Sequence, residues 1–234
     1  KMVTHTGAAC PIEVKRSMID WWGPVLFEAY GASEVGTTCS ITSEEWLEHP
    51  GSVGKAKPPF EALIFDDDGS PLEQGIEGRL YFRDETGRGV IYHNDPEKSA
   101  AAHLEPGVFT LGEIGYLDED GYVYITDRFS DMIVSGGVNI YPAESEQVLI
   151  THHNVLDVAC IGVPDKEMGE RLLALVIIDD SETLVTENEL LEYCRENLTH
   201  YKCPKKIEFV DDLGRTTMGK INKRKLRAPY WENT

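Results

Sequence analysis

The sequence has no apolar run of membrane-spanning length: no stretch approaches the roughly 20 apolar residues that a spanning helix needs. Cysteine is scarce and shows no pattern. The five cysteines are odd in number and no two have CxxC spacing, which argues against a disulfide framework and against a zinc site. We therefore expect reduced thiols and a cytoplasmic protein, and we leave peripheral association with a membrane open.

Basic charge is also in short supply, because 22 Lys and Arg stand against 41 Asp and Glu and the formal net charge is −19. Such a chain repels a phosphate backbone, so we expect no nucleic-acid partner. The basic residues that exist gather near the end, where residues 202–227 hold nine Lys/Arg and three acids. This segment is either a solvated surface or a part that closes over a small polyanion such as a nucleotide or CoA.

The sequence also lacks a phosphate-binding loop of the GxxxxGK[ST] type. Gly219-Lys220 resembles its end, but Ile221 stands where Ser or Thr is required. The sequence begins with Lys1, and its first residues do not have the pattern of a signal peptide. We expect the chain to be an internal cut from a longer protein.

The first part of the chain indicates a helix followed by a strand. Pro11 suits the first turn of a helix, and the apolar residues Val14, Met18 and Trp22 recur at a spacing of four. This spacing predicts one buried helical face. Gly23-Pro24 ends the helix, and the apolar run 25–29 predicts a short buried strand.

The later pattern predicts two domains. Residues 50–127 contain short apolar runs separated by Asp-Gly turns, which is typical of β-structure. Beyond residue 129 strand-like runs alternate with helical ones, and Thr186 and Glu189 have the spacing of a capping box. We predict domains at 1–129 and 130–234 in a fold that combines α/β and α+β parts.

The segment Tyr30-Gly31-Ala32-Ser33-Glu34 directly follows the predicted strand at 25–29, where α/β folds place ligands. An aromatic ring can stack on a base, and a glycine lets the backbone approach a ligand. A hydroxyl can donate to a phosphate oxygen, and a carboxylate can bind Mg²⁺. The alternative is an ordinary polar turn.

Two further segments carry charged residues beside glycines or turns. Glu113 follows Gly112 at the edge of a predicted strand, where a carboxylate can accept both hydroxyls of a ribose. Arg128 presents a fixed-charge fork suited to phosphate or ribose oxygens. The alternatives are a hairpin with acidic turns and a simple β-turn.

The last two segments are glycine-rich loops. Gly136-Gly137 permits a backbone shape that side chains would block. Lys220 follows a glycine in the loop 214–221, from which it can deliver a positive charge to a developing phosphoanhydride charge. A solvated basic tail is the alternative reading of this loop.

Taken in order, these segments resemble the adenylate-forming superfamily, which includes acyl-CoA synthetases, firefly luciferase and peptide-synthetase adenylation domains. The stretches 21–25, 93–98 and 162–170 are most similar to bacterial fatty acyl-CoA synthetases. The resemblance covers the whole chain and implies the C-terminal part of the large domain, a sheet plus a β-barrel-like subdomain, followed by a small mobile α+β domain.

The resemblance implies that the first domain binds ATP and AMP. It assigns the loop 7–9 to the adenine, Tyr30 to stacking on it, and Glu34 to Mg²⁺. Glu113 stands where the family usually has the Asp that binds the ribose, and Leu111 stands where it usually has Thr. The full set of implied nucleotide-binding residues is Gly7, Ala8, Ala9, Tyr30, Gly31, Ser33, Glu113 and Arg128.

The resemblance places the other roles in the second domain. Lys220 matches the lysine required for adenylation, although Gly214 replaces a common Pro in its loop. Ser130 falls at the domain hinge, where Asp or Lys is usual. The implied CoA-binding residues line the pantetheine tunnel and are Ser135, Gly136 and Gly137.

The implied activity is ATP-dependent acyl-CoA ligation, in which a carboxylic acid, ATP and CoA give acyl-CoA, AMP and pyrophosphate through an acyl-adenylate. We expect fatty or related hydrophobic acids. Bulkier acids (steroid, bile-acid or aryl), transfer to a carrier protein, and a non-catalytic nucleotide- or CoA-binding relative are alternatives. Because the family's phosphate loop is missing from this sequence, we expect the chain alone to be inactive. Homo-oligomer formation is left open.

Overall fold

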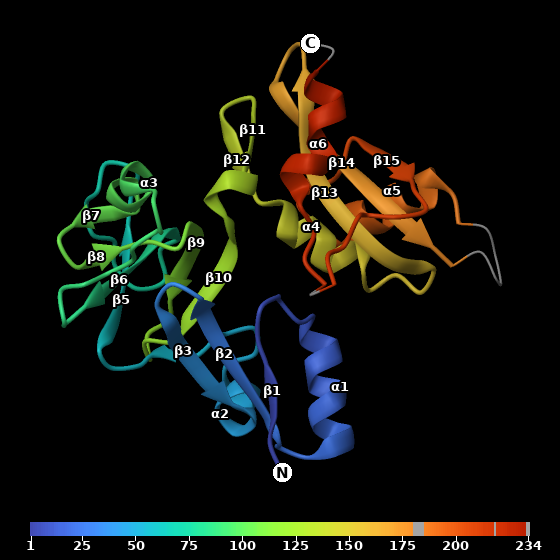
Figure 1. Cartoon of the computed structure of the whole chain (residues 1–234). Coiled ribbons are helices and arrows are strands. Elements are labelled where there is room, and N and C mark those ends of the chain that lie inside the picture. Colours follow the sequence, from blue (N-terminus) through green and yellow to red (C-terminus); the bar gives the residue numbers. More distant parts are fainter. Residues whose placement is uncertain (180–184, 218, 233–234) are drawn as a thin grey trace. The chain divides into compact units, whose positions relative to one another are not determined.

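The computed structural model describes residues 1–179, 185–217 and 219–232 (Figure 1). The chain forms two compact units, residues 1–129 and 130–234. Both combine helices with β-sheets, which confirms the α/β class predicted from the sequence. None of the helices in the described part of the chain has the length and apolar character needed to cross a membrane.

The first sheet of unit 1 (residues 1–129) has four strands in the order β1-β2-β3-β4. β1 runs parallel to β2, and the other neighbours are antiparallel. The elements in and around this sheet are β1 (Val3–His5), α1 (Ile12–Trp22), β2 (Leu26–Ala32), β3 (Gly36–Thr42), α2 (Ser43–Glu48) and β4 (Lys55–Ala56).

The second sheet of unit 1 has six antiparallel strands, in the order β10-β9-β6-β8-β7 with β5 paired to β6. Its core contains the fully buried rings of Phe82 and Phe109, packed with Leu80 and Val123. The elements are β5 (Phe60–Phe65), β6 (Gly78–Asp84), α3 (Pro96–Ala101), β7 (His103–Glu105), β8 (Val108–Phe109), β9 (Glu113–Leu117) and β10 (Val123–Arg128).

The buried face predicted for α1 is wrong. The helix forms as expected, but two members of the predicted face are exposed, Val14 at 49% and Trp22 at 42%. The buried residues are Lys15 and Ile19. Ile19 packs in an apolar cluster, and Lys15 forms an ion pair with Glu28 of β2, so contacts with the sheet select the face.

Unit 2 (residues 130–234) is built on a five-stranded sheet with the order β12-β11-β14-β13, to which β15 adds in parallel beside β14. Its centre is the long antiparallel pair β13 and β14. The elements are η1 (Phe129–Asp131), β11 (Ile133–Ser135), β12 (Val138–Ile140), α4 (Pro142–Leu149), β13 (Val155–Asp165), β14 (Gly169–Ile178), α5 (Glu187–Asn197), η2 (His200–Lys202), β15 (Lys206–Phe209) and α6 (Lys223–Trp231).

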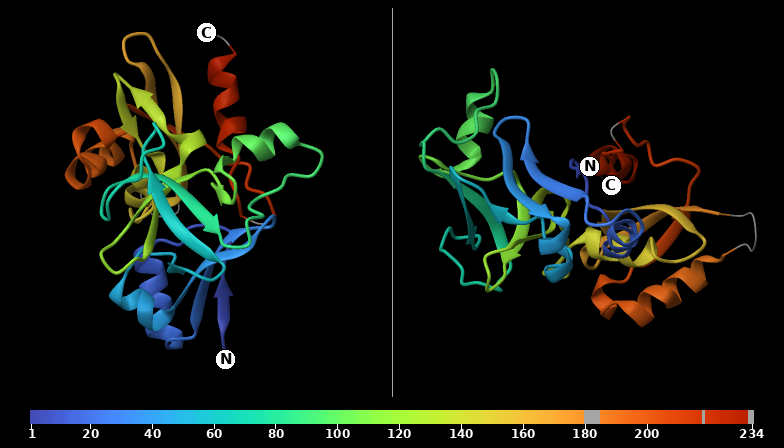
Figure 2. Two further views of the ribbon diagram at one scale, coloured as in Figure 1. Left: turned by 90° about the vertical axis from the view of Figure 1, so that its left-hand side faces the viewer. Right: turned by 90° about the horizontal axis from the view of Figure 1, so that it is seen from below.

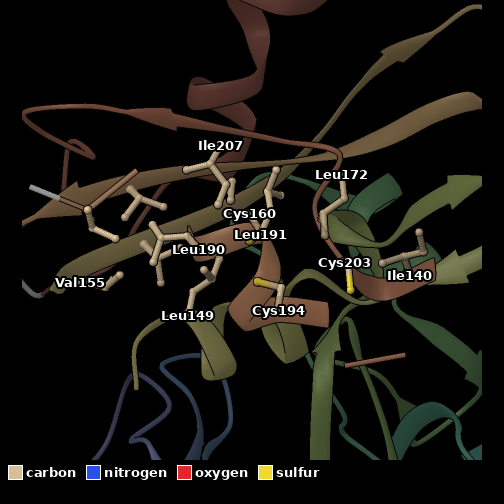
Figure 3. Packing of buried hydrophobic residues seen from close by; sticks show 14 of the residues in the cluster. Ile140, Leu149, Val155, Cys160, Leu172, Leu190, Leu191, Cys194, Cys203 and Ile207 are labelled. Carbon is tan, nitrogen blue, oxygen red and sulfur yellow. The ribbon is translucent and has the colours of Figure 1, made fainter. Parts of the chain in front are cut away.

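Helices cover both faces of the unit 2 sheet. Val158 and Cys160 of β13 pack with α4 and α5 on one face, in the cluster drawn in Figure 3. Ala159 and Ile161 point to the other face and pack against α6. The views in Figure 2 show α5 and α6 on opposite sides of this sheet. Successive residues of a strand face opposite ways, so burial on both faces gives the continuous apolar run of β13.

The capping box predicted for α5 is confirmed. The Thr186 hydroxyl accepts a hydrogen bond from the Glu189 backbone N–H at 3.3 Å, and the Glu189 carboxylate accepts one from the Thr186 N–H at 2.7 Å. Both contacts satisfy amides that the first turn of a helix leaves without partners. Leu190, Leu191 and Cys194 then face the core.

Candidate functional site

Tyr30 and Gly31 lie within β2, whereas the sequence predicted them directly after a strand. β2 continues to Ala32 because its end pairs with β3 in a hairpin, and the pairing is irregular between Tyr30 and Gly31. A Cβ on Gly31 would lie 2.0 Å from the carbonyl oxygen of Gly36. Only glycine fits this close approach of two backbones, so the residue shapes the irregularity beside Tyr30.

Ser33 and Glu34 lie in the exposed turn between β2 and β3. Glu34 belongs to no cluster of three or more potential metal-binding side chains among the described residues. A single carboxylate still suits Mg²⁺, which keeps several waters and takes further oxygen ligands from substrate phosphates.

The structure brings Tyr30, Glu113 and Arg128 together from three strands of unit 1. Glu113 begins β9 and lies directly opposite Arg128 of β10, and the Arg128 Nε is 3.9 Å from the Glu113 Oε1. The Tyr30 Oη and the Glu113 Oε2 are buried, and neither has a hydrogen-bond partner in the described part of the chain. We call these three residues the Tyr30–Glu113 corner.

Burial dominates the electrostatics of this corner. It raises the pKa of Glu113, although the Tyr30 hydroxyl and the Arg128 charge act in the opposite direction. Burial also raises the pKa of Tyr30 well above its usual value, and the Glu113 charge adds to that rise. A buried carboxylate oxygen without a donor suits a ligand that brings hydroxyl groups, so the corner fits a ribose.

The backbone at Glu113 is fixed by a neighbouring threonine. The Thr110 hydroxyl donates to the Leu80 carbonyl at 2.7 Å and accepts from the Gly112 N–H at 3.0 Å. The Gly112 carbonyl accepts from the Phe129 N–H at 2.8 Å, next to Arg128. These bonds hold the start of β9 against the end of β10.

Tyr92 is a residue of this region that the sequence reasoning missed. Burial raises its pKa first, and the charges of Glu34 and Glu113 raise it further, which places its hydroxyl in the field of both carboxylates. The available signal was its position directly before the segment 93–98, which resembles bacterial fatty acyl-CoA synthetases.

The loop 7–9 connects β1 to α1 and is exposed, with Gly7 at a φ of 91°. No hydrogen bond joins this loop to Tyr30 or Glu113 within the described residues. The predicted contact of this loop with adenine stays a prediction.

The predicted CoA-binding residues form the tight turn between β11 and β12 in unit 2. Ser135 is buried at the end of β11, and Gly136 and Gly137 have φ values of 58° and 81°. The Gly136 N–H donates to the Met168 carbonyl at 2.8 Å. Two successive residues in the left-handed region favour glycine strongly, which explains the pair. A Cβ on Gly137 would meet open space.

Ser130 lies in η1, at the border between the two units. It is exposed, and its hydroxyl donates to the Asp131 carboxylate at 3.3 Å. This position is compatible with the predicted hinge role, which stays a prediction.

Lys220 lies in the loop between β15 and α6. Its backbone N–H donates to the Thr216 hydroxyl at 3.1 Å, and its carbonyl accepts from the Thr216 N–H at 2.9 Å. The side chain is exposed, and its ammonium makes no hydrogen bond or ion pair with the described residues. A closed turn thus presents a positive charge to solvent.

The order of these features matches a known class of enzymes. Residues 1–90 match the family described as AMP-binding enzyme, and residues 144–220 match its C-terminal domain, described as AMP-binding enzyme C-terminal domain. The chain belongs to this adenylate-forming family.

Relatives include two long-chain-fatty-acid–CoA ligases. FadD13 of Mycobacterium tuberculosis is 41% identical over 209 residues, which are 88% of this chain and 40% of the relative. The enzyme of Bacillus subtilis is 37% identical over 229 residues, which are 97% of this chain and 40% of the relative. The chain therefore spans about two-fifths of the length of these relatives.

Solved structures of similar fold include ATP-bound MatB from Rhodopseudomonas palustris, with a TM-score of 0.87 and 32% identity over 98% of this chain and 45% of that one. A second is o-succinylbenzoate CoA synthetase from Bacillus subtilis in complex with an acyl-adenylate, with a TM-score of 0.84 and 29% identity over 97% of this chain and 46% of that one.

Proposed function

We propose that this chain is part of an ATP-dependent acyl-CoA ligase that activates a hydrophobic carboxylic acid through an acyl-adenylate. The observation that carries the proposal is the Tyr30–Glu113 corner, in which the buried Tyr30 hydroxyl and the buried Glu113 Oε2 have no hydrogen-bond partner among the described residues and lie beside Arg128. The similarity to long-chain-fatty-acid–CoA ligases supports the same function.

In this proposal the corner and its surroundings hold the nucleotide. Tyr30 stacks on the adenine, Glu113 accepts the ribose hydroxyls, and Arg128 contacts ribose or phosphate oxygens. The loop 7–9 lies against the adenine, and Gly31 lets the backbone approach. Glu113 is longer than the aspartate usual in the family. Its buried Oε2 without a partner supports the ribose role.

Ser33 and Glu34 form the polar end of this nucleotide site. The exposed Ser33 hydroxyl donates to a phosphate oxygen, and Glu34 is the protein ligand of Mg²⁺. When bound, Mg²⁺ neutralises charge on the phosphates. The turn between β2 and β3 presents both side chains to the same polyanion.

Lys220 acts in the first half-reaction. An oxygen of the substrate carboxylate bonds to the α-phosphorus of ATP, the bond between the α- and β-phosphates breaks, and pyrophosphate leaves. The Lys220 ammonium bridges carboxylate and phosphate oxygens and stabilises the charge that develops there, so its help is positional and electrostatic. The open, unpaired side chain seen in the described residues suits this task.

The second half-reaction uses the turn between β11 and β12. The CoA sulfur bonds to the acyl carbon, the bond from that carbon to the AMP oxygen breaks, and AMP leaves. Ser135, Gly136 and Gly137 line the path of the pantetheine arm in this proposal. In this proposal unit 2 rotates about Ser130. The rotation withdraws Lys220 from the reacting centre and brings the turn between β11 and β12 to it.

Long-chain fatty acids are the favoured substrates because of the relatives, and the chain's own residues leave the acyl pocket undefined. Steroid, bile-acid and aryl acids are the alternatives. A panel of acids assayed with CoA and ATP, with products identified by mass spectrometry, separates them. Acyl transfer to a carrier protein without transfer to CoA would identify a different branch of the family. A cytoplasmic location and homo-oligomer formation are further proposals, which cell fractionation and the size of the full-length protein in solution test.

The proposed role of Lys220 in adenylation is tested by the variant Lys220→Ala of the full-length protein. We expect ATP–pyrophosphate exchange to fall by about 100-fold or more, because a residue that stabilises transition-state charge contributes roughly 3 kcal/mol. Conversion of preformed acyl-adenylate to acyl-CoA is expected to continue. Unchanged exchange would reject the role of Lys220. Binding of AMP or CoA without any turnover in the wild type would reject the ligase and identify a non-catalytic relative.

A further inference from the structure

The lysine loop, by which we mean the described residues 211–217 and 219–222, contains a turn that is closed by backbone hydrogen bonds. The Gly219 N–H donates to the Thr216 carbonyl at 2.8 Å, and Thr216 and Lys220 exchange the bonds given above. Gly219 has a φ of 78°, which the turn requires. These local bonds shape the turn. They do not by themselves fix its place on unit 2.

Arg215 connects this turn to the sheet. Its Nε and Nη2 lie 2.5 Å and 2.6 Å from the two carboxylate oxygens of Asp157, on β13. Its Nη1 donates to the carbonyl of Gly219, the residue directly before Lys220. One guanidinium thus binds a strand of the sheet and the far side of the turn at the same time.

Asp157 is itself held in place. Its Oδ1 accepts a hydrogen bond from the Val158 N–H at 2.8 Å, and it lies where the pairing of β13 with β14 shifts register. From this irregular position in the strand, the Asp157 carboxylate contacts Arg215 of the loop. The carboxylate also raises the pKa of Arg215, so the guanidinium keeps its charge.

A second ion pair fixes the other end of the loop. The Lys223 Nζ lies 2.8 Å from the Glu146 Oε1 of α4, and the same oxygen accepts the Cys160 N–H of β13 at 2.6 Å. Asn222 caps α6 by accepting the Lys225 N–H at 3.0 Å. In the chain, Lys220 therefore lies between two ion-paired residues: Arg215, which pairs with Asp157 of β13, and Lys223, which pairs with Glu146 of α4.

Arg215 forms more hydrogen bonds than a simple surface ion pair requires. A lysine could satisfy Asp157, but only a planar fork with several donors can bind both carboxylate oxygens and a carbonyl together. The third contact fixes the backbone one residue before Lys220. An exposed ion pair contributes at most about 1 kcal/mol to folding, so stability alone does not explain the arrangement.

We infer that Arg215, oriented by Asp157, is a positioning residue that holds the Lys220 backbone where its ammonium can reach the reacting phosphate. The inference rests on the proposed function of Lys220. Its consequence is specific: losing the third contact disorders the placement of Lys220 without altering the nucleotide corner or the CoA turn, which contain neither residue.

The first test uses the two half-reactions of the full-length protein. We expect Arg215→Lys and Asp157→Asn each to lower the kcat of ATP–pyrophosphate exchange by about tenfold or more, since small misplacements are costly, with the KM for ATP within about twofold. Conversion of preformed acyl-adenylate with CoA is expected to stay unchanged. The double variant should lose little more than either single one, because both remove the same contact. Arg195→Lys is the matched control, since Arg195 pairs with Glu192 on the exposed side of α5.

The outcomes separate the inference from the function on which it rests. If Lys220→Ala loses exchange while Arg215→Lys keeps it, the inference is wrong and the function stands. If both half-reactions fall together in Arg215→Lys, the residue is only structural and the inference is again wrong. If Lys220→Ala keeps exchange, the proposed function fails.

A second test is independent of catalysis. In the 234-residue chain, Arg215→Met should speed the amide hydrogen exchange of Gly219 and Lys220 by about tenfold, which corresponds to about 1.4 kcal/mol of local opening. Amides in the centre of β13 and β14, such as those of Cys160 and Val176, should be unaffected. Exchange at Gly219 and Lys220 equal to that of the wild type would overturn the inference whatever the activity shows.

Discussion

The Tyr30–Glu113 corner of unit 1 and the lysine loop of unit 2 treat their polar groups in opposite ways. In the corner, a phenol oxygen and a carboxylate oxygen are buried and have no hydrogen-bond partner among the described residues. Around the loop, Arg215 and Lys223 are both paired with carboxylates. The corner keeps buried polar atoms without hydrogen bonds, whereas the charged residues Arg215 and Lys223 on either side of Lys220 are both paired.

The difference indicates two ways of preparing a site. Buried polar atoms without hydrogen bonds lower the stability of the fold. A ligand whose hydroxyls form those hydrogen bonds stabilises the folded protein when it binds. Satisfied ion pairs around a loop instead fix its backbone and leave one chosen charge, that of Lys220, for the substrate. A binding site and a mobile catalytic charge therefore place different demands on the same types of residue.

The largest loss of stability should follow from Gly31→Ala, which disturbs the backbone of β2 beside Tyr30. The added Cβ would lie 2.0 Å from the Gly36 carbonyl oxygen, so β2 and β3 must separate. We expect unit 1 to lose more than about 2 kcal/mol of stability, measured by native-state hydrogen exchange. Gly75→Ala is the control for the backbone strain of an added Cβ without a clash, since Gly75 has a φ of 81° and open space around its Cα, and we expect it to cost only about 1 kcal/mol. Equal losses in the two variants would contradict the close approach.

The next effect concerns what the corner binds. Glu113→Ala removes the proposed acceptor of the ribose hydroxyls, and hydrogen bonds to a charged group contribute about 1.5 to 3 kcal/mol. We expect AMP to bind the full-length protein about tenfold more weakly or worse, measured by calorimetry. Glu61→Ala is the control, because Glu61 pairs with Arg83 on an exposed part of the same unit. An AMP affinity within about twofold of the wild type would exclude Glu113 as the ribose ligand.

Local patterns predicted several elements of both units correctly. The α5 capping box follows from two residues three positions apart, and its geometry is set within one turn. The buried face of α1 could not be predicted this way. Val14, Met18 and Trp22 fit a helical spacing, but the contact of Lys15 with Glu28 on the sheet decides which side is buried.

Sequence patterns were also insufficient to predict how the residues of the sites come together. The motif at Tyr30 and the acidic residue at Glu113 were visible as separate segments, yet their meeting depends on the register of β9 with β10 and on the extension of β2. The pair of Arg215 and Asp157 lies 58 residues apart in the chain. No periodicity links such residues, so only the folded sheet brings them together.

The pH dependence of stability should have opposite signs in the two units. Burial raises the pKa of Glu113 from 4.5, so the folded chain holds this proton more tightly than the unfolded one, and stability falls as pH rises above that value. Glu113→Gln should therefore be more stable than the wild type at pH 7, and the gain should vanish below about pH 4. Thermal unfolding at both pH values measures this.

Glu208 in unit 2 is the comparison for that experiment. Lys206 lowers its pKa first, and the Tyr230 hydroxyl adds to the effect, so its contribution to stability is present above the ordinary pKa of 4.5 and is lost as pH falls. Glu208→Gln should destabilise the chain at pH 7 and not in acid. Changes of the same sign in both variants would refute the contrast between the units.

The smallest effects on stability are expected from removing the hydroxyl of either of two tyrosines, which differ in their hydrogen-bond partners. The Tyr230 Oη of α6 donates to the Glu208 carboxylate at 2.6 Å, so Tyr230→Phe removes a hydrogen bond and should cost about 1 kcal/mol. Tyr30→Phe removes a buried hydroxyl that forms no hydrogen bond among the described residues and acts only by lowering the pKa of Glu113, so unit 1 should lose less stability than unit 2 loses from Tyr230→Phe. Hydrogen exchange, read separately in each unit, measures both. A loss at Tyr30 as large as that at Tyr230 would mean that the corner already satisfies its hydroxyl, and its proposed readiness for a ligand would then have no basis.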